Sequence, residues 1–117
     1  MRFALNVPNF GEYGDARVLA DLAREAEESG WDGFFLWDHI AWEGAAHYAD
    51  PRISLFAIAV ETSSIRIGPM IRIGPMVTPL PRRRPWKVAC EAATLPPSGM
   101  SLGEARERVR LGPPDVG

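Results

Sequence analysis

The sequence has little cysteine, no surplus of positive charge and no long apolar run. Cys90 is the only cysteine among 117 residues, so no disulfide can form within the chain, and we expect a reducing, cytoplasmic location. The formal net charge of −2 provides no basic surplus to neutralise the phosphates of a nucleic acid. No apolar run approaches the roughly 20 residues that cross a bilayer, and the N-terminus lacks a signal-peptide pattern. We therefore expect neither nucleic-acid binding nor membrane insertion.

Several local motifs of cofactor and metal sites are also missing. The chain has no glycine-rich dinucleotide fingerprint and no phosphate-binding loop. Two histidines and one cysteine at these spacings do not make a zinc site, so we expect no metal. The hydrophobic content of 46% nevertheless fits a folded chain with the size of one modest domain.

The chain repeats one theme, a short apolar strand followed by a loop and a helix. Residues 3–7 form the first expected strand, and Asp15 can cap a helix that Gly30 ends. One side of this helix carries apolar residues at helical spacing and the other is polar. The apolar set is Val18, Leu19, Leu22, Ala23 and Ala26, and the expected solvated set is Asp21, Arg24, Glu25 and Glu28.

Two further units follow. Residues 33–37 form an apolar strand, and Asp50-Pro51 opens a helix through about Thr62. A third strand is expected within 65–77, and a third helix over 86–95, before Pro96-Pro97. Such units predict an α/β fold with a parallel sheet, either open and doubly wound or closed into a barrel. A (β/α)8 barrel needs eight units and roughly 250 residues, whereas three units are visible here.

A hexapeptide is duplicated in the third-strand region. Residues 65–70 read IRIGPM, and residues 71–76 repeat them without change. Pro69 within a central strand would remove a ladder hydrogen bond, so both copies do not fit comfortably into one strand. We predict that the second copy occupies the sheet and that the first loops out or folds back. A recent in-frame duplication without function also accounts for the repeat, and we favour this account.

Chemistry is expected where the parallel strands end, at 6–11, 37–39 and 76–81. His39 can exchange a proton near neutral pH, and Asp38 can orient or charge it; alternatively, both are ordinary loop residues. Trp42 follows in the same loop and could wall a flat aromatic ligand, whereas His47 fits the surface better. The arginines 82–84 precede a helix, and they suit either an acidic ligand or a solvated turn.

Four segments in order resemble luciferase-like monooxygenases: FALNVPNFGE at 3–12, AREAEESGWDGFF at 23–35, WDH at 37–39, and RIGPMVTPLPRRRPWK at 72–87. The resemblance covers residues 1 to about 95. It implies a partial (β/α)8 barrel of the TIM type, an oxidoreductase or monooxygenase activity on a small organic substrate, and homodimers packed through early helices. It leaves reduced FMN and the deazaflavin coenzyme F420 both open as cofactor, and the Asp38-His39 pair favours F420.

The resemblance also implies roles for individual positions. Asp38 and His39 would lie near the reactive edge of the flavin as the catalytic pair. Asn6, Trp42, Pro75, Met76 and Thr78 would line the cofactor cavity, the last three on a bulged third strand behind the ring. The cofactor would supply hydride transfer or oxygen activation, and the protein would supply orientation and proton management.

The resemblance stops near residue 96. We therefore expect two parts, 1–95 as the first three β/α units and 96–117 as a divergent, loosely ordered tail with a short helix within 102–111. A truncation or frame change near residue 96 would explain this departure, and such a chain would be inactive alone. The alternative is a non-catalytic fragment or binding subunit that pairs its open sheet edge with another chain. A weaker third possibility is an unrelated enzyme that binds a phosphorylated substrate through the arginines 82–84.

Overall fold

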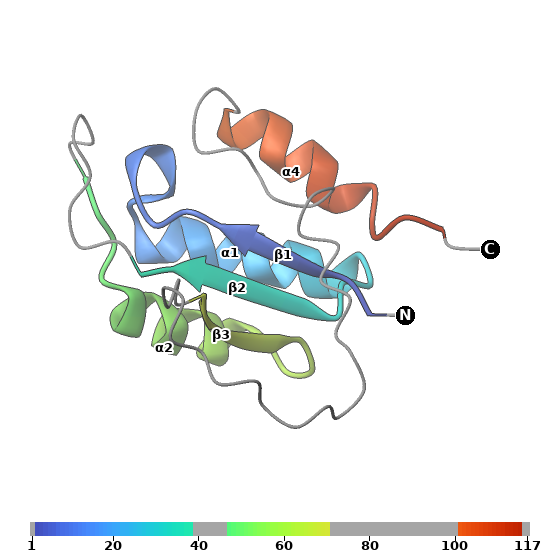
Figure 1. Ribbon diagram of the computed structural model, residues 1–117, viewed down its shortest axis with the longest axis horizontal. Coiled ribbons are helices and arrows are strands. Elements are labelled where there is room, and N and C mark those ends of the chain that lie inside the picture. The colour runs from blue at the N-terminus through green and yellow to red at the C-terminus, as the bar shows by residue number, and fades with distance from the viewer. Residues whose placement is uncertain (1, 39–46, 71–100, 116–117) are drawn as a thin grey trace, which may run out of the picture.

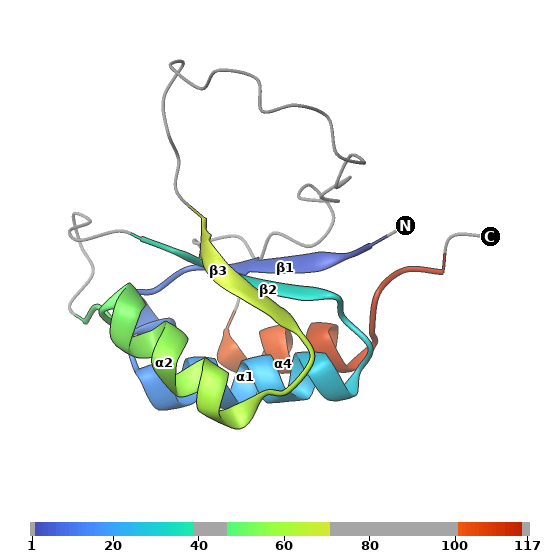
Figure 2. The same cartoon turned by 90° about the horizontal axis from the view of Figure 1, so that it is seen from below.

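The chain folds into a small parallel sheet with helices on one of its faces (Figures 1 and 2). The computed structural model describes residues 2–38, 47–70 and 101–115. The expected third helix at 86–95, Cys90 and the arginines 82–84 lie outside these residues. The elements are, in chain order, β1 (Ala4–Val7), the 3-10 helix η1 (Gly11–Tyr13), α1 (Ala16–Glu28), β2 (Gly33–Trp37), α2 (Pro51–Glu61), β3 (Arg66–Met70) and α4 (Leu102–Arg110).

The three strands are hydrogen-bonded in the order β1-β2-β3, and both pairs are parallel. Leu5 stands beside Phe34, which in turn stands beside Ile67. Each crossover passes through a helix on the same face, as in a βαβ unit (Figure 2). The sheet is therefore a partial TIM-type unit, and the predicted α/β fold with parallel strands is confirmed.

The helices begin where the sequence places their capping residues. The Asp15 side chain accepts a hydrogen bond from the Arg17 amide at 2.8 Å and caps α1. Asp50 accepts from the Arg52 amide at 2.8 Å, and Pro51 occupies the first turn of α2, where its missing N–H costs nothing. Both caps and both helices match the sequence prediction. Gly30, with φ of 84°, follows the end of α1 in a conformation that side chains disfavour.

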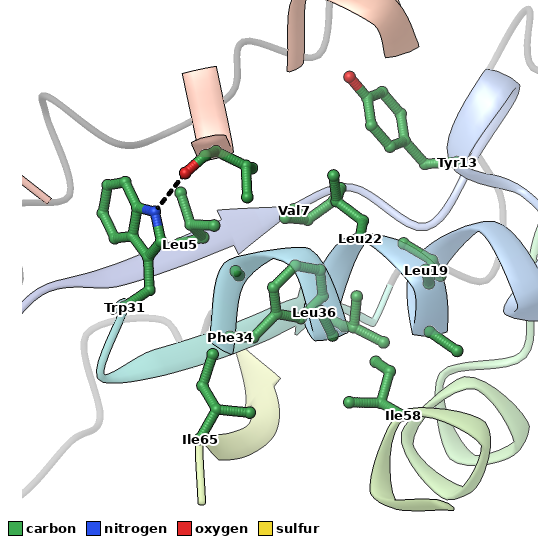
Figure 3. Packing of buried hydrophobic residues seen from close by; sticks show 14 of the residues in the cluster. Leu5, Val7, Tyr13, Leu19, Leu22, Trp31, Phe34, Leu36, Ile58 and Ile65 are labelled. Atoms are coloured by element: carbon green, nitrogen blue, oxygen red, sulfur yellow. Dashed lines mark hydrogen bonds between the residues drawn. The ribbon is translucent and has the colours of Figure 1, made fainter. Parts of the chain in front are cut away.

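The core lies between the sheet and the helices (Figure 3). Leu5 and Val7 of β1, and Phe34 and Leu36 of β2, are completely buried on the helix side. Because side chains alternate along a strand, the residues between them point to the opposite face of the sheet. That opposite face is where Asn6 lies. The predicted apolar stripe of α1 packs onto this core through Leu19, Leu22, Ala23 and Ala26.

The hexapeptide prediction was wrong in its choice of copy. The first copy supplies β3, in which Pro69 stands beside Leu36, while the second copy lies outside the described residues. The Arg66 amide donates to the Asp32 carbonyl at 3.1 Å, and every second residue of β3 directs its backbone N–H and C=O to the same neighbour. The backbone groups of Gly68 and Met70 therefore also point toward β2, and those of Ile67 and Pro69 point toward the outer edge. Proline is tolerated there because its missing N–H belongs to the outer edge, where no described strand pairs with it.

A helix lies within 102–111, as expected, but α4 packs into the core instead of being loosely ordered, and it changes the account of α1. Glu25 was predicted on the solvated side of α1, but it is only 9% exposed. Arg106 of α4 covers it and donates to its carboxylate at 2.6 Å. The helical pattern of α1 alone does not reveal this contact, because the partner lies 81 residues further along the chain.

Candidate functional site

The carboxyl ends of the three strands meet at one edge of the sheet, here called the carboxyl rim. Parallel pairing places the end of β1 at Val7, the end of β2 at Trp37 and the end of β3 at Met70 on this same edge. Loops at this end of a barrel sheet carry the reactive groups in enzymes of this architecture. Of the predicted site residues, the structure describes two here, Asn6 and Asp38.

Asn6 lies on the face of the sheet opposite the helices. It pairs in register with Phe35 of β2, which pairs with Gly68 of β3. Among the described residues, the Asn6 side-chain oxygen is buried and accepts no hydrogen bond. A buried carbonyl oxygen without a donor is costly, by about 1–3 kcal/mol. The position therefore suits a ligand that brings an N–H or O–H group to this face.

Glycine leaves space beside the Phe35 ring. A side chain at Gly33 would approach the Phe35 ring and the Ala4 methyl group to 3.0 Å, closer than carbon atoms normally pack. At Gly68 a methyl group would lie 3.5 Å from the same ring, in ordinary contact. The Phe35 ring thus lies next to two glycines, Gly33 on its own strand and Gly68 on the neighbouring strand β3. Together with Asn6 it forms a floor that is largely apolar and carries one polar acceptor.

Asp38 directly follows β2 and is half-buried at the carboxyl rim. Its predicted partner His39 and the predicted wall residue Trp42 lie outside the described residues. So do Pro75, Met76 and Thr78, which were expected on the third strand. The structure therefore places Asp38 at the end where Asn6 lies, one strand away, and the roles of all seven residues stay predictions.

Sequence reasoning missed an aromatic group at the rim, formed by Phe10, Trp37 and Tyr48. The Phe10 ring lies 5.9 Å from the Trp37 ring and 6.2 Å from the Tyr48 ring, both tilted. These separations are typical of favourable aromatic pairs. The three residues come from the end of β2 and from the two loops that follow β1 and β2. Their position after neighbouring parallel strands was the signal that could have revealed them.

Backbone hydrogen bonds join the same two loops. The Gly11 amide donates to the His47 carbonyl at 3.1 Å, and the Ala49 amide donates to the Asn9 carbonyl at 2.8 Å. The Asn9 side chain, fully buried, also donates to the Ala49 carbonyl at 3.0 Å. Gly14 is required nearby, because a side chain there would lie 2.8 Å from the His47 carbonyl oxygen. This interlock fixes the backbone of His47, which is exposed, as expected for a surface residue.

At the opposite end of the sheet, a carboxylate joins a helix to the start of a strand. Glu27 of α1 accepts hydrogen bonds from the Ser63 amide at 3.0 Å, the Ile65 amide at 2.8 Å, and both the amide and the hydroxyl of Ser64. These donors, chiefly the backbone amides of Ser64 and Ile65, lower the pKa of Glu27 to about 2. The contact ties α1 to the segment that enters β3. It belongs to the amino end of the strands, where barrel folds place stabilising interactions.

A hollow of about 300 Å³ opens beside this contact, lined by Arg2, Trp31, Asp32, Ser64, Ile65 and Arg66. It faces away from the carboxyl rim and contains none of the predicted site residues. Within residues 2–38, 47–70 and 101–115, no cluster of three or more His, Cys, Asp or Glu side chains could hold a metal. The helices in these ranges are too short or too polar to cross a membrane.

Comparison with known proteins gives one match. A family model described as luciferase-like monooxygenase matches residues 1–96. No curated protein and no solved structure matches the chain. The matched range includes β1, α1, β2, α2 and β3 and ends before α4.

Proposed function

Because the chain belongs to the luciferase-like monooxygenase family, we propose that it supplies the first three β/α units of a flavin-dependent oxidoreductase site. The cofactor is reduced FMN or coenzyme F420, with F420 favoured by the Asp38-His39 pair, and the substrate is a small organic molecule. One observation carries the proposal. The parallel register brings the ends of β1, β2 and β3 to one rim, with Asn6 on the face of the sheet opposite the helices.

The described residues fit a flat, nitrogen-rich ring. The buried Asn6 oxygen can accept from a ring N–H, and this would relieve its missing hydrogen bond. Gly33, Phe35 and Gly68 form a surface without projecting polar groups next to it. Most ligand sites have this composition, an apolar wall with a few placed polar groups. When bound, the cofactor supplies the redox chemistry, and the chain supplies orientation and control of protons.

We assign the proton-transfer role in this site to Asp38 and His39. Asp38 would orient the neighbouring imidazole or hold it charged, and His39 would donate or accept a proton at the substrate or ring edge. Trp42 would wall the ring, and Pro75, Met76 and Thr78 would support its far side. The support for these roles is the family resemblance of the segments that carry them. A cytoplasmic location is part of the same proposal and is supported by the single cysteine.

We further propose that the 117-residue chain alone binds the cofactor with an affinity no better than micromolar and does not turn over. The described sheet has three strands, whereas a closed barrel surrounds its site with loops from eight. Most of the enclosing wall is therefore not provided by the described residues. Exclusion of water, which strengthens polar contacts in a closed site, would be correspondingly poor.

Titration of the chain with FMN and with F420, followed by ligand fluorescence, tests the proposal. We expect saturable binding of at least one at micromolar concentration, and Asn6→Ala to weaken it roughly tenfold through loss of one buried acceptor. Asp38→Asn should also weaken binding, whereas Asp21→Asn, on the exposed side of α1, should not. Absence of saturable binding of both cofactors, or equal effects of the two aspartate variants, would contradict the proposal.

A second candidate is a binding subunit that associates with another chain, and the surface of α2 favours it. The outer face of α2, formed by Ile53, Phe56 and Val60, is 63%, 76% and 83% exposed at these residues. An apolar stripe of this kind is typical of a protein contact. We propose that it forms a homodimer contact, consistent with dimers packed through early helices in the family. Pairing through the edge of β3 is less favourable, because Pro69 has no N–H to offer there.

A further inference from the structure

The helix α4 packs tightly against the first β/α unit, although it lies beyond the range that matches the family. Ala105 and Val109 on its inner side are completely buried in the common core. The Trp31 indole N–H donates to the Val109 carbonyl at 2.9 Å, in a buried contact that Figure 3 shows as a dashed line. The same carbonyl also accepts from the Gly112 amide at 3.0 Å, so the indole adds a second donor at the end of α4.

Charged groups position both ends of α4. At the first turn, Ser101 and Glu104 form a reciprocal capping box, and the Glu12 carboxylate accepts from the Leu102 amide at 2.7 Å. Further along, Arg106 and Arg110 reach the same Glu25 carboxylate, at 2.6 and 3.5 Å. Glu25 is nearly buried, so these arginines provide the positive charge that its carboxylate needs.

The outer side of α4 is polar. Glu104, Glu107, Arg108 and Arg110 are exposed, while the two core residues face inward. In proteins built from stacked units, a terminal unit with one apolar and one polar side keeps the last apolar surface out of water. The distribution of side chains along α4 meets this description.

The place of α4 in the layer of helices has a specific meaning. In Figure 1, α1 lies between α2 and α4, and all three helices cover the same face of the sheet. In a closed (β/α)8 barrel each helix has two neighbours in the outer ring, so α1 lies between the second helix and the last. The structure places α4 on the side of α1 where that last helix would lie.

We infer that α4 is a built-in end cap, which takes the position of the final barrel helix and closes the β1–α1 flank within this chain. In this arrangement α4 shields the core residues Leu5, Val7 and Trp31 from water without any further β/α unit. Units that complete a barrel would have to displace α4 before they could pack against α1. The inference concerns the fold alone and does not depend on cofactor binding.

Hydrogen exchange on the full chain tests this inference. Val109→Asp places a charge on the buried side of α4, and Glu107→Asp introduces the same residue on its exposed side as a control. The Trp31 indole proton reports the docking of α4 directly, and the amides of β1 report the flank it covers. We expect Val109→Asp to speed exchange of the indole and of β1 by about tenfold or more, with less change in β3 and none in the control.

Arg106→Gln is the milder variant if Val109→Asp prevents folding. It removes the nearer of the two charges that pair with Glu25 and leaves Ala105 and Val109 in place, so the same probes should exchange faster while the strands stay paired. Faster exchange at Trp31 with unchanged β1 amides would overturn the inference, because α4 would then dock without covering the flank. Rapid exchange of the Trp31 indole in the unaltered chain would overturn it as well.

Discussion

The helices α1 and α2 lie side by side, yet their surroundings differ. α1 buries its apolar stripe and has a polar outer side, with α2 and α4 on its two flanks. α2 fully buries only Ser54 and Ile58, and its outer face exposes Ile53, Phe56 and Val60. A helix that is apolar all round normally lies within a larger assembly. The difference teaches that α4 covers the β1–α1 end of this sheet, whereas the α2 end presents an exposed apolar surface.

The largest expected effect is a difference in unfolding free energy between a truncation on α1 and a truncation on α2. Leu22→Ala on α1 removes a completely buried side chain and should lower the free energy of unfolding by about 2–5 kcal/mol, because the cavity cannot fully collapse. Val60→Ala on α2 changes a side chain that is 83% exposed in the single chain and should stay within about 0.5 kcal/mol at a dilution where the chain is monomeric. Urea unfolding followed by circular dichroism measures both. Equal losses would show that the outer face of α2 is covered in solution.

The outer face of α2 is tested more directly by association. Phe56→Glu places a charge in the centre of this face and should weaken self-association about tenfold or more, while the fold of the monomer is retained. Leu111→Glu is the matched control, since Leu111 is also exposed, at 72%, but lies beyond α4. Sedimentation velocity over a concentration series gives the comparison. Unchanged association in Phe56→Glu would place the contact elsewhere.

The smallest effect concerns Glu27, which links α1 to the segment between α2 and β3. Its pKa is about 2 in the folded chain against an ordinary 4.5, so its contribution to stability is present above pH 4.5 and is lost as the pH falls toward 2. Glu27→Gln should therefore reduce stability at neutral pH, and the gap to the unaltered chain should narrow on acidification. Asp21→Asn, on the exposed side of α1, is the control for the loss of one carboxylate. Parallel stability curves for Glu27→Gln across pH 2–7 would contradict this assignment.

Local signals were sufficient for most of the fold. Asp15, Gly30 and Asp50-Pro51 each act on the few residues beside them, so the bounds of α1 and α2 followed from the sequence. The apolar runs of β1 and β2 likewise predicted buried strands and a shared rim for Asn6 and Asp38. These inferences needed no knowledge of distant contacts.

The failures have a common cause in contacts between distant segments. Glu25 fits a solvated position until α4 brings Arg106 against it. The aromatic group at the rim depends on the pairing of two loops, since Phe10 and Tyr48 are brought together by tertiary structure. The choice between the two hexapeptides depended on the edge of the strand toward which the Pro69 nitrogen points, and this is set by the register with β2. Helical or strand periodicity contains none of this information.

The identical hexapeptides give β3 two interchangeable sources. Exchange of 65–70 for 71–76 would return every side chain to the same neighbour, so the sheet itself cannot distinguish them. The connection before the strand can distinguish them, because Glu27 binds the backbone of Ser63 and Ile65, immediately ahead of Arg66. A shift by one repeat would leave six additional residues between that anchor and the strand. The carboxylate of Glu27 thus favours one register for a strand whose own sequence would allow two.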